Sequence, residues 1–136
     1  MSRSLRLALV VCLLGLLAAC ASPAAPAATP KPEGVVVTFR VADVENYKLR
    51  LTDPADIEIA RKLLAGQEAP GIPNGIVIRG DADVNVGYTW HIDPASVDFA
   101  DFTIEVCDGL PSDVEKAIIT SDRYCLWSAK VIAIDG

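Results

Sequence analysis

The folded part of the chain begins with a stretch that repeats an apolar residue at every second position, Val35-Val36-Val37-Thr38-Phe39-Arg40-Val41. This period places the odd-numbered residues on one face of an extended strand. A second alternating stretch, Tyr47-Lys48-Leu49-Arg50-Leu51, follows after the connection of residues 43–46. We expect both stretches to be strands of one sheet, with their apolar residues facing the core.

A helix is predicted directly after these strands. Asp53 is a favourable N-cap, and Pro54 suits the first helical position because a proline there loses no hydrogen bond. Gly66 is typical of the residue that ends a helix. The residues expected on its apolar face are Ile57, Ala60, Leu63 and Leu64.

Four further strands are predicted, at residues 76–79, 88–93, 102–107 and 128–134. In two of them the apolar residues alternate, and we expect these six to face the core: Tyr88, Trp90, Ile92, Phe102, Ile104 and Val106. Ser112 followed by Glu115 predicts a capping box that opens a second, short helix.

These elements predict an α+β domain over residues 35–136. We expect a small, mainly antiparallel sheet of about five or six strands, with two short helices on one face. A chain of roughly 100 residues is enough for one hydrophobic core.

The first 19 residues have the pattern of an export signal. Arg3 and Arg6 precede an apolar run over residues 7–17, which is too short to span a membrane. The stretch Leu17-Ala18-Ala19-Cys20 resembles the lipobox of bacterial lipoproteins. The resemblance implies cleavage before Cys20 and lipid attachment to its sulfur. The alternatives are an ordinary signal with a chance cysteine and a cytoplasmic protein with an apolar first helix.

A lipid on Cys20 would anchor the mature chain in the cell membrane or outer membrane, facing outside the cytoplasm. The rest of segment 20–34 consists largely of Ala, Pro, Ser and Thr. Such a composition cannot form a core, so we expect a disordered Pro/Ala linker that acts as a spacer.

The charge of the mature chain excludes several partners. Removing Arg3 and Arg6 with the signal would leave 10 basic against 18 acidic residues, a net charge of −8. Nucleic-acid binding needs a basic patch, so no nucleic-acid partner is expected. A polybasic attraction to anionic lipid is equally unsupported.

Two of the four cysteines remain for the folded domain. Cys12 leaves with the signal and Cys20 is taken by the lipid, which leaves Cys107 and Cys125. An even pair in an exported domain predicts a disulfide. Two free buried thiols are the alternative.

The region between Arg79 and Lys116 holds nine carboxylates and no Lys or Arg. Asp81, Asp83 and Asn85 place oxygen atoms at alternate positions, as at the start of a calcium loop. Val86 and Ile92 stand where the EF-hand pattern needs a glycine and a glutamate. Calcium binding at these three residues is therefore one hypothesis, and a polar turn between strands is the alternative.

His91 is the single histidine, and Asp93 follows two residues later. The pair could act as a base with its orienting carboxylate, which would suit a hydrolase or an inhibitor accessory. The alternative is a structural histidine hydrogen-bonded to Glu105 or Thr89. Trp90 and Trp127 are expected to pack near the disulfide, with a ligand platform as the less favoured role.

Several blocks of the second half of the domain together resemble a known family. The blocks are residues 88–94 (Tyr-Thr-Trp-His-Ile-Asp-Pro), 99–101, 103–112, 114–115 and 124–130. They are similar to the amino-terminal domain of a calmodulin-binding protein, a domain found also in small secreted bacterial proteins. Leu126 departs from the family, which has proline between the second cysteine and the tryptophan. The resemblance implies no catalytic residues, and it does not imply calmodulin binding.

The function predicted from sequence is a binding or interaction module without enzymatic turnover. It would be tethered to the membrane through Cys20 and would bind an unidentified protein or glycan partner. No cofactor is expected. A calcium-dependent adhesion-type module and a hydrolase or inhibitor accessory using His91 and Asp93 are the alternatives.

Overall fold

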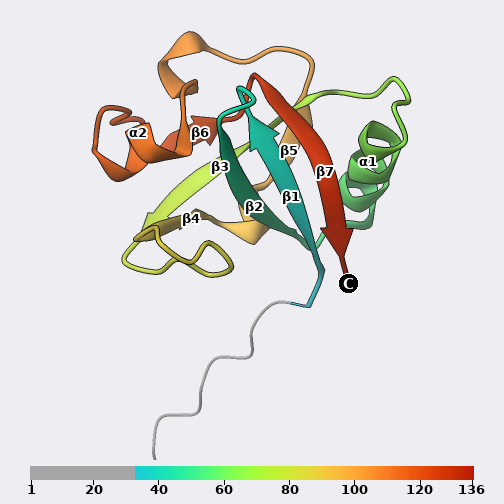
Figure 1. Cartoon of the computed structure of the whole chain (residues 1–136), viewed down its shortest axis with the longest axis horizontal. Coiled ribbons are helices and arrows are strands. Elements are labelled where there is room, and N and C mark those ends of the chain that lie inside the picture. Colours follow the sequence, from blue (N-terminus) through green and yellow to red (C-terminus); the bar gives the residue numbers. More distant parts are fainter. Residues whose placement is uncertain (1–32) are drawn as a thin grey trace, which may run out of the picture. The chain divides into compact units, whose positions relative to one another are not determined.

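A computed structural model describes residues 33–136 (Figure 1). The elements are β1 (Val35–Val41), β2 (Glu45–Leu51), α1 (Pro54–Leu64), β3 (Ile72–Arg79), β4 (Trp90–Ile92), β5 (Asp98–Ala100), α2 (Pro111–Glu115), β6 (Arg123–Cys125) and β7 (Ala129–Asp135), with 3-10 turns at Pro94–Ser96 and Glu105–Cys107.

The predictions for the export signal, Cys20 and nearly all of segment 20–34 lie outside the described residues. Neither helix in residues 33–136 has the length and apolar character needed to cross a bilayer.

The first sheet has the strand order β2-β1-β7, and both pairs are antiparallel. The two strands predicted from alternation are confirmed, with Val37 opposite Leu49 and Phe39 opposite Tyr47. Their inward side chains are almost completely buried, which explains why period two is so clear in this part of the sequence.

The second sheet is built around β3, which pairs antiparallel with β4, β5 and β6. This strand begins four residues earlier than predicted, because Pro73 and Gly75 gave its first half the appearance of a loop. Gly75 is required there, since a Cβ atom at this position would collide with the Ile92 side chain. Strand β6 was not predicted, since it has only three residues.

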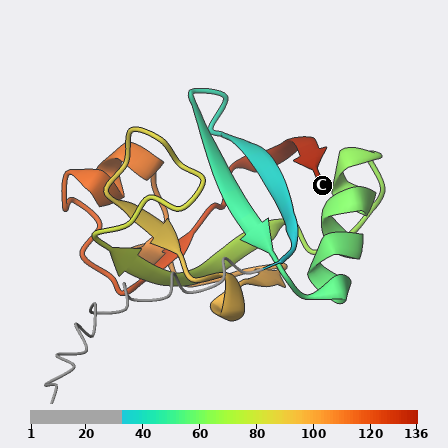
Figure 2. The ribbon, with the colours of Figure 1, turned by 90° about the horizontal axis from the view of Figure 1, so that it is seen from below.

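The predicted α+β class, the antiparallel pairing and the single disulfide are confirmed. Within residues 33–136 the strands number seven and are divided between two sheets. Helices α1 and α2 lie at opposite sides of the domain in both Figures 1 and 2, so they do not share one face as expected.

Helix α1 begins as predicted. The Asp53 carboxylate accepts a hydrogen bond from the Ala55 N–H at 2.7 Å, and Gly66 has a φ of +70° just beyond the helix end. The helix packs beside β7 and buries Ala60 completely, while Leu64 stays partly exposed. The apolar face is therefore narrower than expected.

The capping box predicted for α2 is wrong in its residues. Pro111 occupies the first helical position, which makes Leu110 the N-cap, and the Asp113 carboxylate accepts from the Leu110 N–H at 3.0 Å. The Glu115 carboxylate instead accepts hydrogen bonds from Thr89. Proline displaced the helix start because it fits the first turn without losing a hydrogen bond.

An aromatic cluster forms the centre of the core. The Tyr47 and Trp90 rings stack with centroids 4.7 Å apart, and Tyr124 meets Trp90 edge-on at 5.4 Å. All three side chains are inaccessible to solvent. Burial raises the pKa values of Tyr47 and Tyr124 far above the usual range, so both hydroxyls stay protonated.

Replacing both disulfide cysteines should destabilise the domain strongly. Cys107 and Cys125 are bonded and 18 residues apart, so closure of this loop should contribute about 3 kcal/mol. We expect the Cys107→Ala/Cys125→Ala variant to lose about that much unfolding free energy in urea titrations. A loss below about 1 kcal/mol would show that packing alone holds this part of the fold.

Candidate functional site

Segment 102–106, which we call the apolar strap, carries large apolar side chains on the surface. The exposed fractions of Phe102, Ile104 and Val106 are 82%, 67% and 69%. The predicted strand over residues 102–107 is therefore wrong, as is the predicted burial of these three side chains. Residues 101–104 belong to no helix or strand, and residues 105–107 form a 3-10 turn.

Two contacts fix the orientation of the strap. Cys107 is fully buried and bonded to Cys125, beside the buried Ile72. The Trp127 indole N–H donates a hydrogen bond to the Thr103 hydroxyl. Residues 103 and 107 are thus both held against the domain, and the apolar side chains between and beside them are exposed.

Trp127 itself is 37% exposed and extends this surface, whereas Trp90 is buried in the core as expected. The exposed strap was missed, although the sequence held a signal for it. The signal is the disulfide expected at Cys107, because a buried cysteine at the end of this segment competes with the burial of the apolar residues that alternate with it.

The surroundings of the strap are acidic. Asp101, Glu105 and Asp108 are exposed, and none forms an ion pair with another residue of the described domain. These three residues belong to the long stretch that contains no Lys or Arg. The surface thus combines apolar side chains with negative charge.

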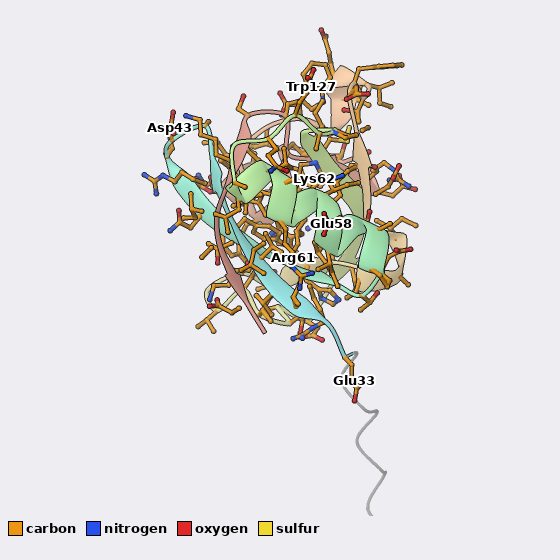
Figure 3. The ribbon with its side chains drawn as sticks, turned by 90° about the vertical axis from the view of Figure 1, so that its right-hand side faces the viewer. Glu33, Asp43, Glu58, Arg61, Lys62 and Trp127 are labelled. Atoms are coloured by element: carbon orange, nitrogen blue, oxygen red, sulfur yellow. A yellow bond between two sulfur atoms is a disulfide. The ribbon has the colours of Figure 1, made fainter. Side chains whose placement is uncertain are left out.

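The strap lies far from the point where the N-terminal segment joins the domain. Figure 3 shows Trp127 and Glu33 at opposite ends of the domain, with α1 between them. The surface around Trp127 is thus at the end of the domain opposite Glu33, the first residue that the structure describes.

The three candidate calcium ligands make hydrogen bonds within the protein. The Asp83 carboxylate forms two hydrogen bonds with the Arg50 guanidinium, both 3.1 Å long. The Asp81 carboxylate accepts from the Asp83 N–H at 2.9 Å. The Asn85 carboxamide accepts from the Lys48 N–H and donates to the Lys48 carbonyl, each at 2.8 Å.

Asn85 therefore serves as a short substitute for a neighbouring strand at the free edge of β2, which protects this edge from pairing elsewhere. In the part of the chain that the structure describes, no group of three or more His, Cys, Asp and Glu side chains is arranged to hold a metal ion. Calcium binding at these residues stays a prediction.

The side chains of His91 and Asp93 form hydrogen bonds with different partners. The His91 Nδ1 atom lies 2.7 Å from the Asp81 carbonyl oxygen and donates to it, and the Asp93 carboxylate accepts from the Ala95 N–H at 3.0 Å. The expected partners Thr89 and Glu105 do not bond to His91. Asp93 thus begins a 3-10 turn and does not orient the imidazole.

Two shallow hollows occur elsewhere on the surface, and neither is lined by His91 or Asp93. One of about 180 Å³ lies beside Asp108 and Asp113, and one of about 190 Å³ lies beside Lys48 and Tyr88. Burial raises the pKa of Tyr88 to about 12, and the Glu45 carboxylate that accepts its hydroxyl hydrogen bond adds to the rise.

Comparison with known proteins identifies one family. A family model described as the BP-74 N-terminal domain matches residues 33–135, which confirms the resemblance found in the second half of the domain. No curated protein and no solved structure gives a significant match.

Removing the Asn85 side chain should destabilise the domain whether or not calcium is present. The Lys48 N–H and carbonyl would lose their partners, so Asn85→Ala should lower the unfolding free energy by about 1–3 kcal/mol. Urea titrations in EDTA and in calcium would measure this loss.

The matched control is Asn46→Ala on the exposed side of β2, which should cost less than about 0.5 kcal/mol. An Asn85→Ala protein that is unimpaired in EDTA but loses a calcium-dependent gain in stability would make Asn85 a metal ligand and refute its role at the strand edge.

Proposed function

The chain belongs to the BP-74 N-terminal domain family, and we propose that it is a lipid-tethered extracytoplasmic module that binds a protein partner through the apolar strap. The observation that carries the proposal is the exposure of Phe102, Ile104 and Val106 in one anchored segment. Contiguous exposed apolar side chains on a small domain are typical of an interaction surface.

The energy available from this surface is large. Complete burial of a Phe, Ile or Val side chain is worth about 1.5–3 kcal/mol relative to exposure. The strap is also held before binding, by the disulfide at Cys107 and the hydrogen bond from Trp127 to Thr103. A surface ordered in advance loses less conformational entropy when a partner covers it.

The chemistry of the strap favours protein over glycan. Ile104 and Val106 are aliphatic and protrude from the surface. Such side chains are suited to the dry centre of a protein interface, where apolar anchors contribute most of the binding energy.

The lipid tether would display this surface. A lipid on Cys20 would hold the chain at a membrane, and the Pro/Ala linker would extend by up to about 3.1 Å per residue. Since Trp127 lies at the end of the domain opposite Glu33, the tether would join the domain away from the strap and would leave the strap uncovered. This arrangement suits a partner outside the cytoplasm.

A photoreactive amino acid at position 104 should cross-link a protein partner in intact cells. The same amino acid at position 58 is the matched control, because Glu58 is exposed on α1, away from Trp127 (Figure 3). We expect an adduct from position 104 and none from position 58. Purified wild-type chain should compete for the adduct, and a chain with Phe102→Ser and Val106→Ser should not.

The two serine substitutions replace exposed side chains, so the melting temperature of that chain should stay close to that of the wild type, which a thermal melt would verify. Equal adducts from positions 58 and 104, or an adduct that survives the serine substitutions, would refute the strap as the binding surface. An adduct whose whole added mass is removed by glycosidases would replace the protein partner with a glycan.

The tether is tested through the cysteines of the leader. Cells that express the wild-type chain with labelled palmitate should yield a labelled mature chain whose first residue is Cys20. Cys20→Ser should abolish the label, because the acylated sulfur is gone, while Cys12→Ser should retain it. A label that persists in Cys20→Ser, or its absence from the wild type, would contradict lipid anchoring.

A further inference from the structure

We infer that the partner segment is cationic: a polypeptide that brings apolar side chains to the strap and lysine or arginine residues to the carboxylates beside it. This inference rests on the proposed function and names the chemistry of its partner. It comes from the charges around the strap, whereas the proposed function comes from the exposed apolar side chains.

The carboxylates are arranged to meet such a segment. Asp101 and Asp108 stand just beyond the two ends of the strap, and Glu105 lies between Ile104 and Val106. All three are exposed, and within the described domain none is neutralised by an ion pair. A protein surface that covered the apolar side chains would therefore approach three unpaired negative charges.

The charge sign then decides between partners. Covering the strap removes water, and the lower effective dielectric strengthens each charge interaction at the rim. An acidic partner would be repelled. A neutral partner would remove water from the carboxylates and supply no positive charge in its place, which costs binding free energy. A cationic partner gains from both the apolar contact and the charges, and its association is accelerated by electrostatic steering.

The same argument disfavours two other occupants. A second copy of the chain would bring its own Asp101, Glu105 and Asp108 against the same residues of the first, on a mature chain with a net charge of −8. An anionic lipid surface would be repelled for the same reason.

The test uses short fluorescent peptides that carry leucines between lysines, between glutamines or between glutamates. Their binding to the mature lipoprotein in nonionic detergent is followed by fluorescence anisotropy. We expect the lysine peptide to bind at least about tenfold more tightly than the glutamine peptide, and the glutamate peptide to bind weakest. Added salt should lower the affinity of the lysine peptide more than that of the other two, because salt screens the attraction between its lysines and the carboxylates.

Charge reversal on the strap supplies the decisive comparison. Glu105→Lys should lower the affinity of the domain for the lysine peptide and raise its affinity for the glutamate peptide. Glu58→Lys on α1 should change neither affinity. Glu58 is the matched control, since it is an exposed glutamate distant from Trp127 (Figure 3). Thermal melts of both variants verify that each is folded.

The outcomes separate this inference from the proposed function. Glutamine and lysine peptides of equal affinity would overturn the cationic partner and leave the apolar strap as the binding surface. If none of the three peptides binds, the inference is also overturned. The proposed function is tested separately, by cross-linking from position 104. Cross-linked dimers of the chain, or equally tight binding to phosphatidylglycerol vesicles, would replace the cationic polypeptide with a second copy or a membrane.

Discussion

The disulfide between Cys107 and Cys125 is the constraint that decides which side chains this domain exposes. Both cysteines are fully buried, so residue 107 must face the interior. The backbone that leads to it runs past Trp127, whose indole N–H holds the Thr103 hydroxyl. Between these two held residues, Ile104 is 67% exposed. A bond that stabilises the fold by closing a loop therefore also orients a surface.

The sequence predicted an element correctly where its periodic pattern arises from burial against the core, and wrongly where a contact distant in the chain decides the local structure. Strands β1 and β2 and helix α1 were predictable because their patterns arise from burial against one core and from a cap at Asp53. The strap has the same period as a strand, but period two specifies only that alternate residues face opposite sides. In the structure the strap is not a strand, and Cys107 is buried through its bond to a residue 18 positions away while Ile104 and Val106 stay exposed. Strand β3 was underestimated because Gly75 makes room for Ile92, a tertiary contact that the local pattern does not contain.

The acidic loop shows why oxygen-rich spacing is weak evidence for a metal. Asp, Asn and Gly are frequent in turns because their side chains bond to nearby backbone and tolerate left-handed conformations. Asp83 has a φ of +45° and binds Arg50, while Asn85 completes the edge of β2. A polar turn between strands was the alternative to calcium, and these residues lie in the connection between β3 and β4. The identity of their partners came from strand β2, more than 30 residues earlier in the chain.

Charge and apolar exposure depend on one another on this domain. An exposed strap of Phe102, Ile104 and Val106 would promote self-association on a neutral protein. Here the exposed carboxylates of Asp101, Glu105 and Asp108 lie within and beside it, and their mutual repulsion would oppose the contact of two straps. The free domain can therefore display apolar side chains without covering them. This repulsion would be absent for a positive approaching surface, so the charges that would keep copies of the chain apart are the same charges that would favour a cationic partner.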